Sequence, residues 1–228
     1  MRELAARLVL LGILCPAIAV GESQAASKVD RAVEVVDEIM AVPDRSIPEY
    51  LFRDAAAIAV IPDVLKAGLF VGGRRGKGIM SLRCADGSWG PPLFISLSGG
   101  SVGWQVGVQR VDIVLVFKSG RSVDAVLEGR FTLGADAAIA VGPVGRHAEA
   151  TTDIELQAEI YSYARARGFF AGLALEGSVL QVDQDLNADL YGIDGLSAQD
   201  VVEGRLGPIP PQAVLFRRAL ERHFAAAD

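Results

Sequence analysis

Residues 68–117 read GLFVGGRRGKGIMSLRCADGSWGPPLFISLSGGSVGWQVGVQRVDIVLVF, and this stretch decides the fold. Its apolar residues alternate with polar residues or glycines, which is the period-two pattern of β-strands. We predict strands over 79–84 and 93–97, joined by a hairpin turn at Asp86-Gly87. The alternation resumes over 102–108, and the almost continuous apolar run 111–117 is typical of a central strand.

Helical patterns flank this block on both sides. Residues 28–40 have apolar side chains at helical spacing, with Ser27 as the expected N-cap and Pro43 after the end. Because strands do not alternate with helices, the sequence predicts one α+β domain whose core is a strongly curved, largely antiparallel sheet or a barrel-like β core, flanked by helices at both ends. The other expected helices are 48–54, 119–128, 183–191, 197–203 and 212–225, and the other expected strands are 56–61, 131–133, 137–141, 154–163 and 169–182.

Composition excludes several classes of protein. The chain has 228 residues, 51% of them hydrophobic, and a formal net charge of −6, so it has enough apolar surface for a stable core. A negative net charge disfavours bulk electrostatic binding of nucleic acid. Two histidines and two cysteines leave little material for a zinc site or a disulfide framework. We therefore expect no metal, no cofactor and no nucleic-acid partner.

The first 25 residues have the pattern of a secretory signal. Arg2 and Arg7 precede an uncharged apolar run over 8–20, which is too short to span a bilayer. Small residues at Ser23 and Ala25 predict cleavage near Ala25, which leaves 26–228 as the mature domain, and 17–19 offers an earlier cleavage site. Cys15 raises a lipoprotein alternative, but Leu14 precedes it where a small residue is normal. We expect an exported protein of the periplasm or cell envelope.

The segment 66–83 concentrates positive charge among glycines. It contains five Lys or Arg residues and no acid, and exposed backbone amides beside arginines favour bound anions. Lys77 is followed by Gly78 where a phosphate-binding Walker loop has Ser or Thr, so the segment is not a nucleotide loop of that kind. The alternatives are a solvated strand face or a sheet edge kept basic to prevent strand pairing.

Two further motifs point to other chemistries. Gly99-Gly100-Ser101-Val102-Gly103 fits the G-x-S-x-G pattern of a hydrolase nucleophile, with His147 as the only well-placed histidine. The alternating residues after Ser101 predict a strand where that nucleophile needs a helix. The acidic run at 183–189 has partial calcium-loop spacing, and capping of a helix explains the same residues. Trp89 and Trp104 are expected to be buried aromatic anchors rather than a membrane or sugar platform.

Several blocks in one order resemble the SYLF domain family, over roughly residues 55–192. The resemblance implies a lipid-binding fold without known catalytic residues. Eukaryotic members bind phosphoinositides and the yeast branch binds actin, whereas secreted bacterial members are similar to envelope lipid-binding proteins. The blocks are KAGLFVGGR (66–74), DGSW (86–89), QVG (105–107), TLG (132–134), AVGPVGR (140–146), YSY (161–163), RGFFAG (167–172) and LEGS (175–178).

The resemblance carries over to individual residues in part. Lys66, Arg74 and Arg146 match basic positions of the family pattern, whereas Arg75 and Lys77 are additional positive charges in this chain. We therefore predict a non-enzymatic lipid-binding protein of the cell envelope that recognises anionic phospholipid headgroups through a Gly/Arg/Lys-rich loop. Actin binding is expected to be unlikely for an exported chain. The alternatives are a protein-interaction module of the envelope and, less favoured, a serine hydrolase acting through Ser101. The predicted headgroup site comprises Lys66, Arg74, Arg75, Lys77, Arg83 and Arg146.

Overall fold

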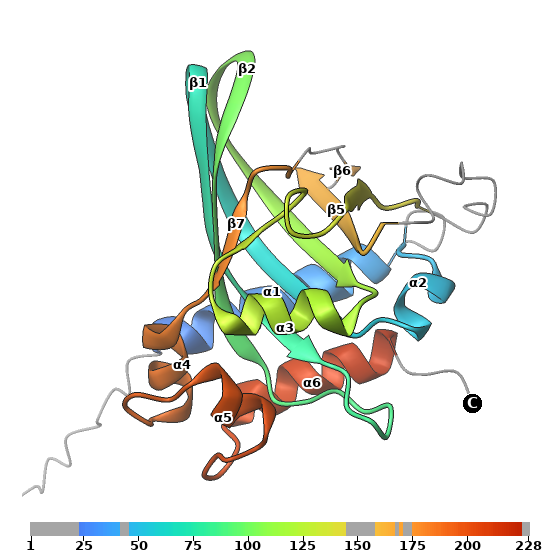
Figure 1. The fold of residues 1–228 in the computed structure, drawn as a ribbon, viewed down its shortest axis with the longest axis vertical. Coiled ribbons are helices and arrows are strands. Elements are labelled where there is room, and N and C mark those ends of the chain that lie inside the picture. The colour runs from blue at the N-terminus through green and yellow to red at the C-terminus, as the bar shows by residue number, and fades with distance from the viewer. Residues whose placement is uncertain (1–22, 42–45, 145–157, 167–168, 171–174, 225–228) are drawn as a thin grey trace, which may run out of the picture.

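The computed structural model describes residues 23–41, 46–144, 158–166, 169–170 and 175–224, with the backbone alone for 68–71, 101–107 and 169–170. Its elements confirm the predicted α+β class, with a strongly curled, open sheet flanked by helices at both ends of the chain (Figure 1). The helices are α1 (Gln24–Met40), α2 (Glu49–Arg53), α3 (Gly120–Glu128), α4 (Gln184–Tyr191), α5 (Ala198–Val202) and α6 (Pro211–His223). The strands are β1 (Ala57–Leu82), β2 (Leu93–Phe117), β3 (Phe131–Thr132), β4 (Ile139–Val141), β5 (Ile160–Ala166), β6 (Phe169–Phe170) and β7 (Val179–Val182).

Two very long strands form the centre of the sheet. β1 and β2 pair antiparallel along nearly their whole length, from Ala57↔Phe117 to Met80↔Leu93. The hairpin turn at Asp86-Gly87 is confirmed, with Gly87 at φ 83° and its amide donating to the carbonyl of Cys84. The segments predicted as strands in this region are strands, but their separation is wrong, because they belong to two continuous strands that bend within the sheet. Irregularities in the register at 61–64 and 68–70 absorb these bends.

Pro62 shows how the longer strand is possible. The expected strand 56–61 stops just before Pro62, but β1 continues, because Pro62 lies in the first register shift and β1 needs no ladder bond from it there. The next residue, Asp63, has a left-handed φ of 51°, and its amide donates to the Asp112 carboxylate across the ladder (3.0 Å). The strand continues after this bulge.

The paired ribbon folds back on itself, so that β1 passes beside its own beginning (Figure 1). Near the ends of the strand, the Arg83 amide donates to the Ala56 carbonyl (2.8 Å). Further along, a Cβ placed on Gly78 would lie 2.2 Å from the Val60 carbonyl oxygen, and one on Gly76 would lie 2.7 Å from a Val64 methyl group. The two halves of β1 therefore touch through glycines that leave no room for a side chain.

The remaining strands extend the sheet from both halves of β2. β7 pairs with the first half, at Ile95↔Val182, and β3 pairs with β7. β5 pairs with the second half, at Phe117↔Ile160, and carries β4 and β6. Each half of the β1–β2 ribbon thus has its own neighbours, and the whole sheet curls around the bend.

Both faces of the sheet are buried. Ile58, Val60 and Val114 pack in one hydrophobic cluster with α1, α2, α4 and α6. Ile61 and Ile113, on the opposite face, belong to a second cluster closed by α3 and α5. This two-sided burial explains why the run 111–117 is almost entirely apolar.

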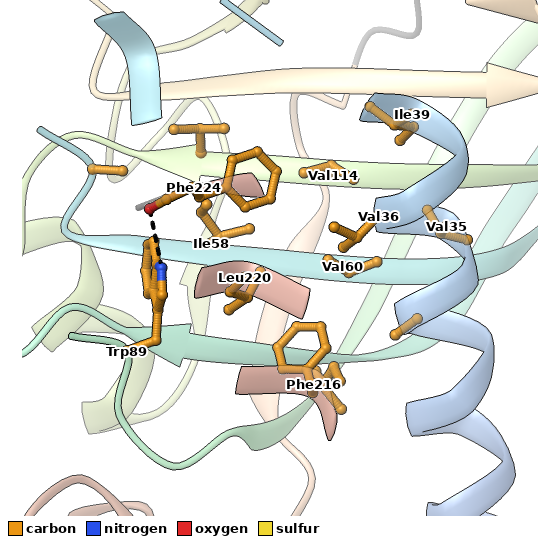
Figure 2. Close-up of a cluster of buried hydrophobic side chains, with 14 of the residues drawn as sticks. Val35, Val36, Ile39, Ile58, Val60, Trp89, Val114, Phe216, Leu220 and Phe224 are labelled. Atoms are coloured by element: carbon orange, nitrogen blue, oxygen red, sulfur yellow. Dashed lines mark hydrogen bonds between the residues drawn. The ribbon is translucent and has the colours of Figure 1, made fainter. Parts of the chain in front are cut away.

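Helices α1 and α6 meet over the first cluster. Figure 2 shows Val36 of α1 and Phe216 and Leu220 of α6 lying over the strand residues. The indole of Trp89 is 1% exposed and donates to the Phe224 carbonyl (3.2 Å), which ties the hairpin to the end of α6. Burial of this tryptophan is confirmed, whereas the side chain of Trp104 lies outside the described part of the chain.

Arg83 is a structural clamp at the hairpin. Its guanidinium donates to the carbonyls of Phe52 (2.7 Å), Gly87 (2.9 Å) and Phe224 (3.1 Å), and its Nε donates to Ala55 (3.1 Å). The group also lies over the Trp89 ring, 4.1 Å from the ring centroid. One side chain thus joins α2, the hairpin and the end of α6.

The start of α1 bears on the predicted cleavage site. The helix begins at Gln24 rather than after Ser27, and the Ser23 hydroxyl caps it by accepting from the Ala26 amide (3.1 Å). Ala25 is fully buried, and its amide donates to Asp189 of α4 (3.1 Å). A cut near Ala25 would remove this cap, so the described helix favours the earlier site at 17–19. The cleavage position itself stays a prediction.

We expect Gly78→Val to lower the free energy of unfolding by about 2–3 kcal/mol, because its Cβ would collide with backbone of the first half of β1. Gly73→Ala is the control, since its Cβ would lie at an ordinary 3.8 Å from the nearest atom. Urea titration followed by circular dichroism measures both variants. Equal stability of the two would contradict the packing described here.

We expect Arg83→Met to lower the free energy of unfolding by about 3 kcal/mol, because four carbonyl oxygens lose a charged donor. Arg75→Met should change it by less than about 0.5 kcal/mol, since Arg75 is exposed. Thermal unfolding of the two variants provides the comparison, and a fully stable Arg83→Met protein would refute the clamp.

Candidate functional site: a cationic arch

The predicted basic loop is a strand. All residues from Lys66 to Lys77 lie in β1, which pairs with β2 over this region. Alternation therefore sends neighbouring side chains to opposite faces of the ribbon, as the solvated-strand alternative required. The six predicted headgroup residues consequently have very different surroundings.

Three of the six are already engaged with the protein. Arg83 holds the hairpin carbonyls, and burial lowers the pKa of its guanidinium, opposed by the charge of Asp54. Arg74 is 8% exposed and donates to the Gly100 carbonyl (2.9 Å), and burial likewise lowers its pKa. Lys77 forms a 2.7 Å ion pair with the largely buried carboxylate of Asp183. These interactions favour structural roles for the three groups.

The other three differ in what can be said of them. Arg75 is exposed and Lys66 is half-buried, and neither forms an ion pair with any residue that the structure describes. Arg146 lies outside the described residues, as does His147. The six residues therefore remain a prediction as a headgroup site, and Lys66 and Arg75 are the members best placed to meet a ligand.

Strand pairing adds a cation that sequence reasoning missed. Arg110 of β2 pairs with Leu65 of β1 and is exposed. It is 27 residues beyond Arg83 in the chain, so a search for charge runs does not connect it with the segment 66–83. The only available signal was the hairpin register, which follows from the turn at Asp86-Gly87.

We define the cationic arch as residues 64–82 of β1 and 93–111 of β2, the bent part of the ribbon (Figure 1). It contains five basic residues and no acidic residue, in a chain whose net charge is −6. The rest of the chain therefore sums to −11. Such segregation produces a local positive field despite the acidic total. The five basic residues are Lys66, Arg74, Arg75, Lys77 and Arg110.

Acidic residues at the base of the arch are paired with a helix. The Asp112 carboxylate forms an ion pair with the guanidinium of Arg31 in α1, with 3.1 Å between Oδ2 and Nη2. The Asp63 carboxylate lies 3.8 Å from Nε of the same guanidinium. The nearest acids in sequence are thus held at the α1 side of the ribbon. The charged residues of the arch itself are therefore all basic, and Lys77 among them is paired with Asp183.

The competing motifs find no support in the geometry. Ser101 lies within β2 opposite Gly72, and the strand continues after it, so the strand–turn–helix context of a hydrolase nucleophile is missing. Asp183 is the N-cap of α4, where its side chain accepts from the Leu186 amide (3.2 Å). Over the described ranges, no three His, Cys, Asp or Glu side chains gather as a metal site would require.

A polar cleft of about 440 Å³ lies between α3, β7 and α5, and none of the predicted site residues lines it. In the part of the chain that the structure describes, no helix combines the length and apolarity needed to cross a bilayer. The arch differs from the cleft because it combines several basic residues with exposed side chains.

Comparison with known proteins identifies relatives. A family described as "Ysc84: Las17-binding protein actin regulator" matches residues 98–223. Protein YSC84 of Saccharomyces cerevisiae is 34% identical over 203 residues, covering 88% of this chain and 42% of the relative. SH3 domain-containing YSC84-like protein 1 of Homo sapiens is 34% identical over 193 residues, covering 82% and 56%. LAS seventeen-binding protein 3 of S. cerevisiae is 34% identical over 184 residues, covering 79% and 40%.

The chain spans about half the length of the curated relatives it matches. The family description refers to an actin regulator and to Las17 binding, and one relative is named for binding LAS seventeen, so our expectation that actin binding is unlikely becomes doubtful. None of these names describes an enzyme, which is compatible with a non-enzymatic role. The resemblance noted in the sequence is confirmed: this chain belongs to the Ysc84, or SYLF, domain family.

Proposed function

We propose that this chain is a non-enzymatic protein that binds anionic lipid surfaces through the cationic arch. The observation that supports it is the segregation of charge, with five basic residues and no acid on one projecting ribbon of an acidic chain. Basic residues near an anionic membrane each contribute about 1 kcal/mol to binding. Lys66, Arg75 and Arg110 are the contact residues, because they are exposed or half-buried and form no ion pair within the described chain.

The remaining cations of the arch act at a distance. Arg74 adds to the positive field while its guanidinium stays bonded to the Gly100 carbonyl, whereas the charge of Lys77 is balanced by Asp183. This division changes the headgroup site that was proposed from the sequence. Arg83 now has a structural role, and Arg110 is added to the contact residues. This charge distribution orients the arch toward an anionic surface, because that surface attracts the arch and repels the acidic remainder of the molecule.

The second candidate function is binding of an acidic protein surface by the same arch. The family description and the name of the yeast relative favour it, since they refer to Las17 and actin. Co-sedimentation with actin filaments tests this candidate directly. If the protein binds filaments through the arch and has no affinity for anionic vesicles, the ligand of the arch is a protein and not a lipid.

We further propose that the protein is exported to the periplasm or cell envelope, on the basis of residues 8–20. Because α1 needs Ser23 and Ala25, the secreted form should begin between Val20 and Ser23 and carry no acyl chain. Intact mass and N-terminal sequencing of the secreted protein measure this. A diacylated Cys15 at the N-terminus would show a lipoprotein instead, and an uncleaved chain would remove the export proposal.

Charge reversal tests lipid binding. We expect Arg75→Glu with Arg110→Glu to weaken flotation with phosphatidylglycerol-containing vesicles by about thirtyfold or more at low salt. Binding by the native protein should also fall as salt rises, because exposed charges are screened. The matched control is Arg130→Glu with Arg218→Glu, which changes the charge equally at two exposed residues outside the arch. Equal losses in the two pairs would mean that net charge, not the arch, governs binding.

A further inference from the structure

The far end of the arch carries no charge. Figure 1 shows β1 and β2 extending together beyond the helices before they turn back. The register places residues 68–71 opposite 102–107 at this bend, with Gly68↔Gly107 and Phe70↔Gly103. We call residues 68–71 and 101–107 the tip. Its large apolar residues are Leu69, Phe70, Val71, Val102, Trp104 and Val106.

The described residues just below the tip are also apolar and exposed. Val108 is 72% exposed, the highest value among the large hydrophobic side chains that the structure describes, and Leu65 is 42% exposed. Leu65 pairs with Arg110, and Ala67 pairs with Val108, so these four side chains share one face of the ribbon. An apolar edge therefore lies directly beside an exposed arginine.

The order of apolar and charged residues along the ribbon matches the layers of a lipid surface. From the tip toward the body, the ribbon passes from uncharged apolar residues to exposed Val108, and then to Leu65 paired with the cation Arg110. A bilayer surface presents a matching order, with acyl chains below anionic headgroups. The acids Asp63 and Asp112 come only at the base, where Arg31 holds them.

We propose that the tip of the arch inserts into the interfacial zone of an anionic bilayer, with Arg110, Lys66 and Arg75 at the level of the headgroups. This inference rests on the proposed lipid binding and adds its mode, which is insertion of a β-ribbon rather than adsorption by charge alone. The membrane is favoured over a protein partner because apolar and cationic residues are layered along the direction in which the ribbon projects.

The backbone limits how deep the tip goes. The register shift between Gly68↔Gly107 and Phe70↔Gly103 takes the backbone of residues 104–106 out of the ladder, which then continues to Val71↔Val102. A two-stranded ribbon also has outer edges, whose amides and carbonyls need water or headgroups as partners. Insertion therefore ends near the boundary of headgroups and acyl chains, within about 10 Å of the surface.

Tryptophan fluorescence measures this insertion. The chain has two tryptophans, of which Trp89 is buried in the core and Trp104 lies at the tip. The probe is a set of phosphatidylglycerol–phosphatidylcholine vesicles whose acyl chains carry bromine at a shallow or a deep position. We expect quenching of the native protein by both, stronger for the shallow bromines, and no quenching of Trp104→Phe. Vesicle binding that depends on salt but shows no quenching would overturn insertion and leave the proposed function intact.

A matched pair of variants tests the apolar edge without altering charge. We expect Leu65→Ser with Val108→Ser to weaken vesicle binding by about tenfold or more, and this loss should persist at high salt. Val144→Ser with Leu215→Ser is the control, because these side chains are 43% and 48% exposed elsewhere on the protein. Equal losses in both pairs, or no loss in the first, would contradict insertion. If the native protein does not bind the phosphatidylglycerol-containing vesicles at all, both the insertion and the lipid function are overturned.

Discussion

The close approach of the two halves of β1 is the constraint on which the rest of the structure depends. Gly76 and Gly78 bring the returning half against Ile61, Val64 and the Val60 carbonyl at distances that exclude a Cβ. A hairpin whose strands are 26 and 25 residues long would otherwise extend as a straight ribbon with little core. Folding the ribbon on itself gives each half its own neighbouring strands and makes the curled sheet possible.

Curling creates two buried faces, and the helices follow from them. On one face, α1, α4 and α6 cover Ile58, Val60 and their neighbours. On the other face, α3 and α5 pack against the apolar residues of the second cluster. Trp89 and Arg83 then join the hairpin to the C-terminal end of α6 through the Phe224 carbonyl. The chain ends and the central hairpin thus stabilise one another. The described residues beside the distal bend, Leu65 and Val108, are exposed and lie outside both clusters.

The same bend accounts for the proposed function. A ribbon end without helices on it can project, and this one combines exposed apolar and cationic residues in a chain that is acidic elsewhere. The buried Arg74 and the paired Lys77 show that positive charge alone does not make a contact residue. Lys66, Arg75 and Arg110 differ from these two because they are exposed or half-buried and form no ion pair within the described chain.

Sequence by itself determined the α+β class, the hairpin turn at Asp86-Gly87, most helices and the family, because these depend on local periodicity, turn residues and ordered motifs. It also located the segment 66–83 as the unusual charge cluster. Tertiary structure decided that this segment is a bent strand and not a loop, since bulges at Pro62 and Gly68 act only in the context of a pairing partner. It also decided that Arg83 clamps the hairpin while Arg110 joins the arch. Both outcomes depend on contacts between residues distant in the chain, and local periodicity contains no information about which carbonyls or strands will meet.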